Sequence, residues 1–332
     1  MSKPVVAITM GDPAGVGPEV CLRAVADPRV GAACVPVIVG DRGVLARVAS
    51  AVGLAPPPAA MDPEAWTADL TAPAVVDMRA IDAAAVVPGE MAPACGRAAA
   101  AYIDAAIAAA LDGRAAAVAT APIHKEALRL GGCPHPGHTE IFAAATGAAR
   151  VCMILVGPDL AVSFVTVHVG YADVPAGLTV ERIGEVIDLT AETIGRLLGR
   201  AARIGVCGLN PHAGEHGLFG RREEQRLIAP AVDAARRRGI DLTGPWPADA
   251  IFTPEQRARY DAIVCMYHDQ GHIPFKMLAF DTGVNVTAGL PIVRTSVDHG
   301  TAFDIAWTGR ARPTSLIQAI LLGVRLAEGR RP

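Results

Sequence analysis

The sequence predicts an α/β protein in which helices cover a largely parallel sheet. Short runs rich in valine and isoleucine alternate from end to end with alanine- and leucine-rich stretches of helical period, and this alternation is typical of strand–helix–strand units. The chain has 332 residues, of which 52% are apolar and 19% are charged. It is therefore too apolar to be disordered and longer than one compact core usually needs, so we expect one large domain or two linked domains.

Eight runs are predicted to be strands, because each is short, apolar and rich in β-branched residues. In chain order they are Val5–Thr9, Val35–Val39, Ala116–Thr120, Val151–Val156, Ser163–Val169, Arg203–Gly208, Ala262–Met266 and Val284–Thr287.

Three helices are predicted most clearly between these strands. The alanine-rich stretch Pro93–Leu111 stops at an Asp-Gly pair, and Val180–Leu198 is amphipathic. The stretch Glu223–Arg238 begins with acidic residues and ends in three arginines before Gly239, as the helix dipole and a glycine stop signal favour.

Two loop-rich zones, residues 123–140 and 243–261, indicate where the chain crosses between domains. We expect a terminal α/β domain of residues 1–125 plus 262–332, which carries the cofactor loop. A central α/β domain of residues 126–261 would contain the middle of the chain.

Composition argues against several classes of partner. The formal charge of −3 gives no basic field for nucleic acid. The N-terminus lacks the pattern of a signal peptide, and no uninterrupted apolar run of about 18 residues indicates a membrane span. The seven cysteines are scattered without any C-x-x-C, which favours buried thiols in a reduced cytoplasm. Lysine occurs only as Lys3, Lys125 and Lys276, so a local cationic pocket is the expected means of holding an anion.

Three histidines, His168, His212 and His268, lie at or just beyond the carboxyl ends of predicted strands. The carboxyl ends of strands form the ligand crevice of open α/β sheets. Three imidazoles there would suit a divalent ion such as zinc, with one position open for a substrate oxygen. The alternative, three separate loop or core histidines, stays open. The H-x-x-x-H pairs that end at His216 and His272 are interpreted as loops, so a helical metalloprotease motif is not supported.

Two further segments have the residue types that hold anions. Residues 134–140 precede an alanine-rich helix, so Thr139 or a neighbour would cap it while its free N–H groups face a phosphate or carboxylate. Downstream, Lys276, Asn285 and Arg294 supply a point charge, an amide and a bidentate fork. An ordinary capped helix and solvated loop residues are the alternatives.

The segment Gly11–Glu19 follows a strand and starts a helix, with Pro18 in its first turn. It is not a G-x-G-x-x-G fingerprint, and no P-loop occurs in the chain. A nicotinamide cofactor would therefore bind through a different loop.

Six short motifs in order resemble the 4-hydroxythreonine-4-phosphate dehydrogenase family of pyridoxal phosphate synthesis, over nearly the whole chain. They lie at residues 11–19, 136–140, 208–215, 266–271, 283–287 and 294–302. The resemblance implies a three-layer α/β/α fold of the isocitrate/isopropylmalate dehydrogenase type, with two subdomains and the active-site cleft between them. It also implies NAD or NADP, a divalent metal, and a homodimer with the site near the interface, to which the central domain contributes.

The resemblance also implies roles for individual residues. The metal, zinc or alternatively magnesium, manganese or cobalt, would bind His168, His212 and His268, with Asp249 nearby as a second-rank candidate. The substrate contacts would be His138, Thr139, Lys276, Asn285 and Arg294. The cofactor loop would contribute His299, Gly300, Thr301, Ala302 and Asp304.

Two departures from the family pattern concern specificity. Trp307 stands where relatives commonly carry glycine, which leaves the choice between NAD and NADP open. His272 and the segment Phe275–Asp281 are similar to a paralogous branch that oxidises 4-phospho-D-threonate or 4-phospho-D-erythronate.

The resemblance implies oxidation of the C3 hydroxyl of 4-phosphohydroxy-L-threonine, with decarboxylation to 3-amino-2-oxopropyl phosphate. The metal would lower the pKa of the alcohol. Lys276, Lys125 and a metal-bound water remain open as the general base. Alternatives are a phosphorylated sugar-acid dehydrogenase, a metal-dependent phosphoester hydrolase and a non-catalytic metabolite-binding protein.

Overall fold

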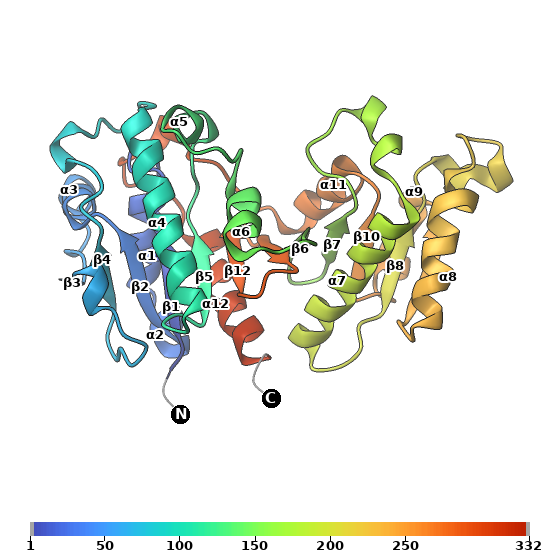
Figure 1. Ribbon diagram of the computed structural model, residues 1–332, viewed down its shortest axis with the longest axis horizontal. Helices are drawn as coiled ribbons and strands as arrows, with labels where there is room; N and C mark the ends of the chain where they lie inside the picture. The colour runs from blue at the N-terminus through green and yellow to red at the C-terminus, as the bar shows by residue number, and fades with distance from the viewer. Residues whose placement is uncertain (1–2, 330–332) are drawn as a thin grey trace. The chain divides into compact units, whose positions relative to one another are not determined.

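The computed structural model describes residues 3–329, which form two compact units (Figure 1). Unit 1 contains the described residues up to Ala149 and from Leu290 onward, and unit 2 is Arg150–Gly289. The predicted boundaries at 125 and 261 differ from these positions. Residues 126–149 form helices that pack on a long helix of unit 1, and residues 262–289 supply two strands and a helix to unit 2.

The strands of unit 1 run in the order β3-β4-β2-β1-β5-β12, and their pairings are parallel. Their bounds are β1 Val5–Thr9, β2 Val35–Gly40, β3 Ala59–Met61, β4 Ala74–Asp77, β5 Ala117–Thr120 and β12 Arg294–Val297. The sequence did not predict β3, which is alanine-rich and exposed, or β4. It also did not predict β12, because that strand starts with an arginine.

Helices cover both faces of the unit 1 sheet. Helices α1 and α12 contact each other on one face of the sheet. Helix α4 covers the other face, because it belongs to the connection from β4 back to β5, which runs along the sheet in the direction opposite to the connections from β1 to β2 and from β2 to β4. The bounds are α1 Gly17–Val25, α2 Pro28–Ala33, α3 Arg42–Val52, α4 Pro93–Leu111, α5 Lys125–Leu130, α6 His138–Thr146 and α12 Thr314–Glu328. The predictions of α4 and of Pro18 in the first turn of α1 are confirmed.

Helix α4 is the one described helix that is long and apolar enough to cross a membrane by length and composition. Half of it is buried, and it packs against β1, β2 and α5. It also carries Arg97 and Asp104. Its place over the sheet accounts for its apolar composition.

The strands of unit 2 run in the order β11-β6-β7-β10-β8-β9. Their bounds are β6 Cys152–Val156, β7 Ala161–Phe164, β8 Ile204–Cys207, β9 Leu242–Trp246, β10 Ala262–Cys265 and β11 Val284–Ala288. Strand β6 pairs antiparallel with both β7 and β11, so the sheet is mixed, whereas β7, β10, β8 and β9 are parallel. Strand β9 was not predicted, because its Gly-Pro step is typical of a loop.

Helices also cover both faces of this sheet. Helix α7 packs on β6, β7 and β10 and carries α8 beside it, and α11 packs on β7 and β10. The bounds are α7 Val180–Leu198, α8 Ala229–Arg237, α9 Ala248–Ile251, α10 Pro254–Arg257 and α11 His268–Ala279, with a π-helical turn at Glu224–Ile228 before α8. The predicted α/β class with helical layers on both sides of the sheet is confirmed.

Helix α11 corrects one sequence interpretation. We expected a loop at residues 268–272 because Gly271 lies there, but this glycine is inside the helix. A Cβ atom at Gly271 would lie 2.7 Å from the ring of Phe164 and 2.8 Å from Sγ of Cys265. The glycine is thus required by the close approach of the helix to the core of unit 2, and it does not mark a helix end.

Candidate active site

Two of the three predicted metal ligands lie together at one edge of the unit 2 sheet. His168 follows β7, and His268 is the first residue of α11 after β10. Because β7 and β10 are parallel neighbours, their carboxyl ends meet there. The two imidazole centroids are 5.8 Å apart.

The third predicted ligand, His212, lies in the segment Pro211–Gly217 after β8. Its φ angle is +53°, and its ring is tilted against Phe219 at 6.1 Å between centroids. Asp249 lies on α9, which packs against this segment. Within residues 3–329, no group of three histidine, cysteine, aspartate or glutamate side chains is placed to hold a metal ion. The metal ligands therefore stay a prediction.

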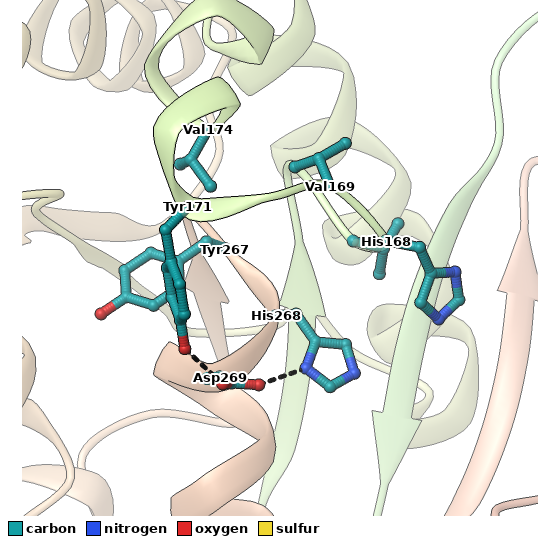
Figure 2. Close-up of a pocket in the computed structure, with 8 residues that line it drawn as sticks. His168, Val169, Tyr171, Val174, Tyr267, His268 and Asp269 are labelled. Carbon is teal, nitrogen blue, oxygen red and sulfur yellow. Dashed lines mark hydrogen bonds and ion pairs between the residues drawn. The ribbon is translucent and has the colours of Figure 1, made fainter.

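A pocket of about 200 Å³ opens beside His168 and His268 (Figure 2). A carboxylate oxygen of Asp269 lies 2.6 Å from Nδ1 of His268, and the Tyr171 hydroxyl donates to the other oxygen. These two donors, Tyr171 first, hold the pKa of Asp269 below its usual range. The lining residues are Val167, His168, Val169, Tyr171, Val174, Tyr267, His268 and Asp269.

The imidazole of His272 stacks on that of His268, one helical turn away on α11. The centroids are 3.7 Å apart and the planes differ by 10°. His272 is buried, its Nδ1 has no hydrogen-bond partner in the described chain, and burial together with the nearby His268 lowers its pKa to about 4. Lys276 follows one turn later, near the ring of Phe280.

Unit 1 contains a cationic cluster where β5, β12 and α6 meet. Arg294 is 2% exposed, donates 2.8 Å to Oγ1 of Thr120, and lies 5.5 Å from the ring centre of Phe142. Burial lowers its pKa to about 9, although the charge of Glu140 opposes the shift. His138 begins α6, and its pKa is held well below 6.5 by burial and then by the charges of Arg294 and Lys125.

The start of α6 has free donors. The N-cap is Gly137 and makes no side-chain cap, so the expectation that Thr139 or a neighbour caps the helix is wrong. His138 Nε2 is buried and finds no hydrogen-bond partner among residues 3–329. The N-terminus of α6, the guanidinium of Arg294 and the imidazole of His138 together suit a phosphate or carboxylate.

The predicted substrate contacts thus belong to different units. His138, Thr139 and Arg294 lie in unit 1, as does Lys125, the first residue of α5. Lys276 and Asn285 lie in unit 2, where the buried Oδ1 of Asn285 on β11 lacks a partner among the described residues.

The predicted cofactor segment His299–Asp304 packs in unit 1 against the loop after β1. Val16 N–H donates 3.0 Å to the Thr301 carbonyl, and a Cβ atom at Gly15 would lie 3.0 Å from the same oxygen. Trp307 is 8% exposed and donates from Nε1 to the Pro13 carbonyl at 3.2 Å. The indole therefore stabilises the contact between these two loops.

Three polar residues at these sites were missed by sequence reasoning. Asp269 and Asp12 lie inside motifs that the sequence did single out, and Asp12 is 1% exposed and accepts from Ala14 N–H at 2.9 Å. Nothing in the sequence marks Tyr171 as a site residue, because isolated tyrosines are common in the surface loops of proteins. Its role becomes visible only from its hydrogen bond.

Comparisons with known proteins show the family to which this chain belongs. The family model described as "Pyridoxal phosphate biosynthetic protein PdxA" matches residues 32–323. A 4-hydroxythreonine-4-phosphate dehydrogenase of Desulfosudis oleivorans is 47% identical, covering 99% of this chain and 98% of its own. A D-threonate 4-phosphate dehydrogenase of Cupriavidus necator is 44% identical, covering 98% of each chain. The crystal structure of a 4-hydroxythreonine-4-phosphate dehydrogenase from Klebsiella pneumoniae has a TM-score of 0.86 at 42% identity, covering 98% of this chain and all of its own.

Proposed function

Because this chain belongs to the pyridoxal phosphate biosynthetic protein PdxA family and is an oxidoreductase, we propose that it oxidises the C3 hydroxyl of 4-phosphohydroxy-L-threonine. The reaction uses NAD or NADP and a divalent metal, and decarboxylation gives 3-amino-2-oxopropyl phosphate. The observation that carries this proposal is the cationic cluster of unit 1, where Arg294 and His138 are held beside the N-terminus of α6. A buried guanidinium favours an anionic substrate, because a phosphate or carboxylate offsets the cost of its desolvation.

The residues at the pocket of unit 2 fit a divalent metal in part. Asp269 holds Nδ1 of His268, which leaves Nε2 to bind a metal, and His168 is adjacent. His212 completes the proposed set. Nitrogen ligands suit zinc best, with magnesium, manganese and cobalt as alternatives. When bound, the metal supplies Lewis acidity at the substrate oxygens, and the nicotinamide accepts the hydride.

The chain's own residues bind the substrate and move its proton. Arg294, His138 and Thr139 bind phosphate and carboxylate, and Asn285 offers a buried amide oxygen to a substrate donor. Lys276 lies two helical turns after His268 on the same face of α11, so its Nζ takes the C3 hydroxyl proton, with Lys125 as the alternative base. The ketone formed is a β-keto acid, which loses CO₂.

The segment His299–Asp304 is proposed to bind the dinucleotide. It includes an exposed stretch at His299 and Gly300, and Ala302 has a φ angle of +43°. The hydrogen bond from Val16 to Thr301 holds the segment in place. Such a preformed backbone loop supports binding without a glycine-rich fingerprint.

We also propose a homodimer in the cytoplasm. On and just after α11, Ile273, Met277 and Phe280 are 60%, 81% and 69% exposed, and large exposed apolar side chains one helical turn apart favour an interface. All seven cysteines are free thiols, which supports a reducing compartment.

The test is an assay of three substrates: 4-phosphohydroxy-L-threonine, 4-phospho-D-threonate and 4-phospho-D-erythronate. Each is assayed with NAD and with NADP, in the presence of zinc, manganese or magnesium. Appearance of NADH or NADPH absorbance with 4-phosphohydroxy-L-threonine supports the proposal. Phosphate release without any change in absorbance would identify a phosphoester hydrolase instead.

A second candidate is oxidation of 4-phospho-D-threonate or 4-phospho-D-erythronate, and both acids belong in the panel. Two observations favour it: a relative named D-threonate 4-phosphate dehydrogenase is nearly as similar as those with the other name, and His272 lies against His268. Turnover of only these acids would replace the first candidate.

A further inference from the structure

Two segments of unit 2 are joined by a hydrogen-bonded chain beside the histidine pocket. Tyr171 lies in the loop after β7, three residues beyond His168, and Asp269 lies in the first turn of α11, next to His268. The Tyr171 hydroxyl donates to Oδ2 of Asp269, and Oδ1 of Asp269 lies 2.6 Å from Nδ1 of His268, within hydrogen-bond distance. Figure 2 shows this chain, with the His268 ring between Asp269 and His168.

This hydrogen-bonded series from Tyr171 through Asp269 to His268 controls which nitrogen of the His268 imidazole carries the lone pair. An ionised carboxylate only accepts hydrogen bonds, so Nδ1 of His268 carries the hydrogen and Nε2 carries the lone pair. A carboxylate held through one oxygen can still rotate. Tyr171 binds the second oxygen and therefore fixes the plane of the carboxylate as well as its position.

Burial does not explain the position of Tyr171. The residue is 69% exposed, and its ring meets Tyr267 edge-on at 5.9 Å between centroids. Little apolar surface is removed from water, so its hydrogen bond to Asp269 is the specific interaction that holds it. The same bond ties the loop that carries His168 to the helix that carries His268.

We propose that Tyr171 is a positioning residue of the divalent-metal site: through Asp269 it fixes the Nε2 lone pair of His268, and through its loop it holds His168 next to that nitrogen. The inference rests on the proposed function for the identity of the ligand, a divalent metal ion. It assigns Tyr171 no contact with the substrate.

The first experiment measures Co²⁺ affinity of the metal-free protein from the absorption of the bound ion. Tyr171→Phe deletes one hydroxyl and retains the ring. Loss of an outer partner of a metal-binding histidine typically weakens affinity about 10- to 100-fold, so Asp269→Ala should fall in this range. Tyr171→Phe, one bond further out, should weaken affinity by up to about tenfold.

The matched control is Tyr267→Phe. Tyr267 lines the same pocket, but no hydrogen bond of its hydroxyl to Asp269 is present in the described structure. This variant should keep the Co²⁺ affinity of the wild type. Equal losses in both tyrosine variants would mean that the pocket responds to any lost hydroxyl, and would overturn the proposal.

The second experiment does not depend on metal or activity. Two-bond ¹H–¹⁵N correlation spectra of the metal-free protein report the tautomer of each histidine. His268 should be protonated at Nδ1 in the wild type and in Tyr267→Phe, and should show a mixture of tautomers in Tyr171→Phe. An unchanged tautomer together with unchanged Co²⁺ affinity in Tyr171→Phe would overturn the proposal.

Kinetics separate positioning from substrate contact. Tyr171→Phe should raise the metal concentration that gives half-maximal activity and leave KM for the substrate unchanged at saturating metal. A changed KM at saturating metal would instead make Tyr171 a substrate contact. If the wild type oxidises none of the panel substrates, the proposed function fails, whereas the tautomer of His268 still decides the role of Tyr171.

Discussion

The cationic cluster of unit 1 and the histidine pocket of unit 2 use opposite physical strategies. In unit 1, Arg294 is 2% exposed, and burial lowers the pKa of this arginine and of His138. In unit 2, Tyr171 is 69% exposed, and hydrogen bonds lower the pKa of Asp269. One site is set up by desolvation and the other by directed hydrogen bonds.

This difference determines what each site can do. Burial leaves little water to screen the charge of Arg294, so a phosphate or carboxylate that enters the cluster of unit 1 interacts strongly with it. Solvent screens the charges in the pocket of unit 2, so its selectivity comes from geometry, through the orientation of His268. Substitutions that remove a ligand or a buried charge should therefore have much larger effects than those that loosen orientation.

The largest effect is expected for His212→Ala. This residue is the third predicted metal ligand, and it follows β8, the strand next to β10 in the sheet. If it binds the metal, its loss removes one of three ligands and should reduce turnover at least 10³-fold, about 4 kcal/mol, while the fold survives. Metal content, turnover and thermal unfolding measure this.

The matched control is His216→Ala, four residues further along the same segment. It should keep both metal and turnover. Full activity in a metal-free preparation of His212→Ala would rule out the proposed metal site.

The next largest effect is expected for Arg294→Ala. Truncation of one partner in a buried charge pair typically costs 2–5 kcal/mol, so kcat/KM should fall about 10²-fold or more. Arg294→Lys keeps the charge but loses the fork and the bond to Thr120. Inorganic phosphate should raise the Tm of the wild type and have little effect on Arg294→Ala. Equal stabilisation of both proteins would place the anion elsewhere.

Most of the fold was predictable because local patterns agree with the final structure. Strand β1 and helices α4 and α7 have the predicted bounds, since apolar runs and glycine or proline signals delimit them. Strand β12 was missed because its first residue, Arg294, is charged, and only the surrounding sheet makes it a strand. Residues 268–272 were misinterpreted because packing against Phe164, a non-local cause, selects the glycine there.

The candidate sites were predictable only in part for a related reason. His168 and His268 follow strands, and the rule for parallel sheets brings such residues together. Tyr171 reaches Asp269 across about a hundred residues of chain, and no periodicity encodes such a contact. The burial that shifts the pKa of Arg294 is likewise a property of the assembled sheet, so composition cannot reveal it.

A smaller effect is expected for Lys276→Arg. Lysine is rare in this chain, and here it lies half-buried on α11, where a compact ammonium can both bind and give up a proton. Arginine keeps the charge but stays protonated, so kcat should fall roughly tenfold with a smaller change in KM. Arg294→Lys provides the inverse exchange in unit 1, and its effect should fall on KM instead. A normal kcat in Lys276→Arg would leave Lys125 as the candidate base.

The smallest effect concerns acid stability. The pKa of His138 lies well below 6.5 in the folded protein, so below about pH 6.5 the unfolded chain binds a proton that the folded chain does not. Stability therefore falls as the pH drops from 6.5 towards the folded pKa, and His138→Gln should lose less, by about a few degrees of Tm at pH 5. Phosphate should reduce the loss in the wild type, because an anion beside His138 raises its pKa. Parallel Tm curves for the two proteins between pH 5 and 7 would show that desolvation at unit 1 does not control the charge of this histidine.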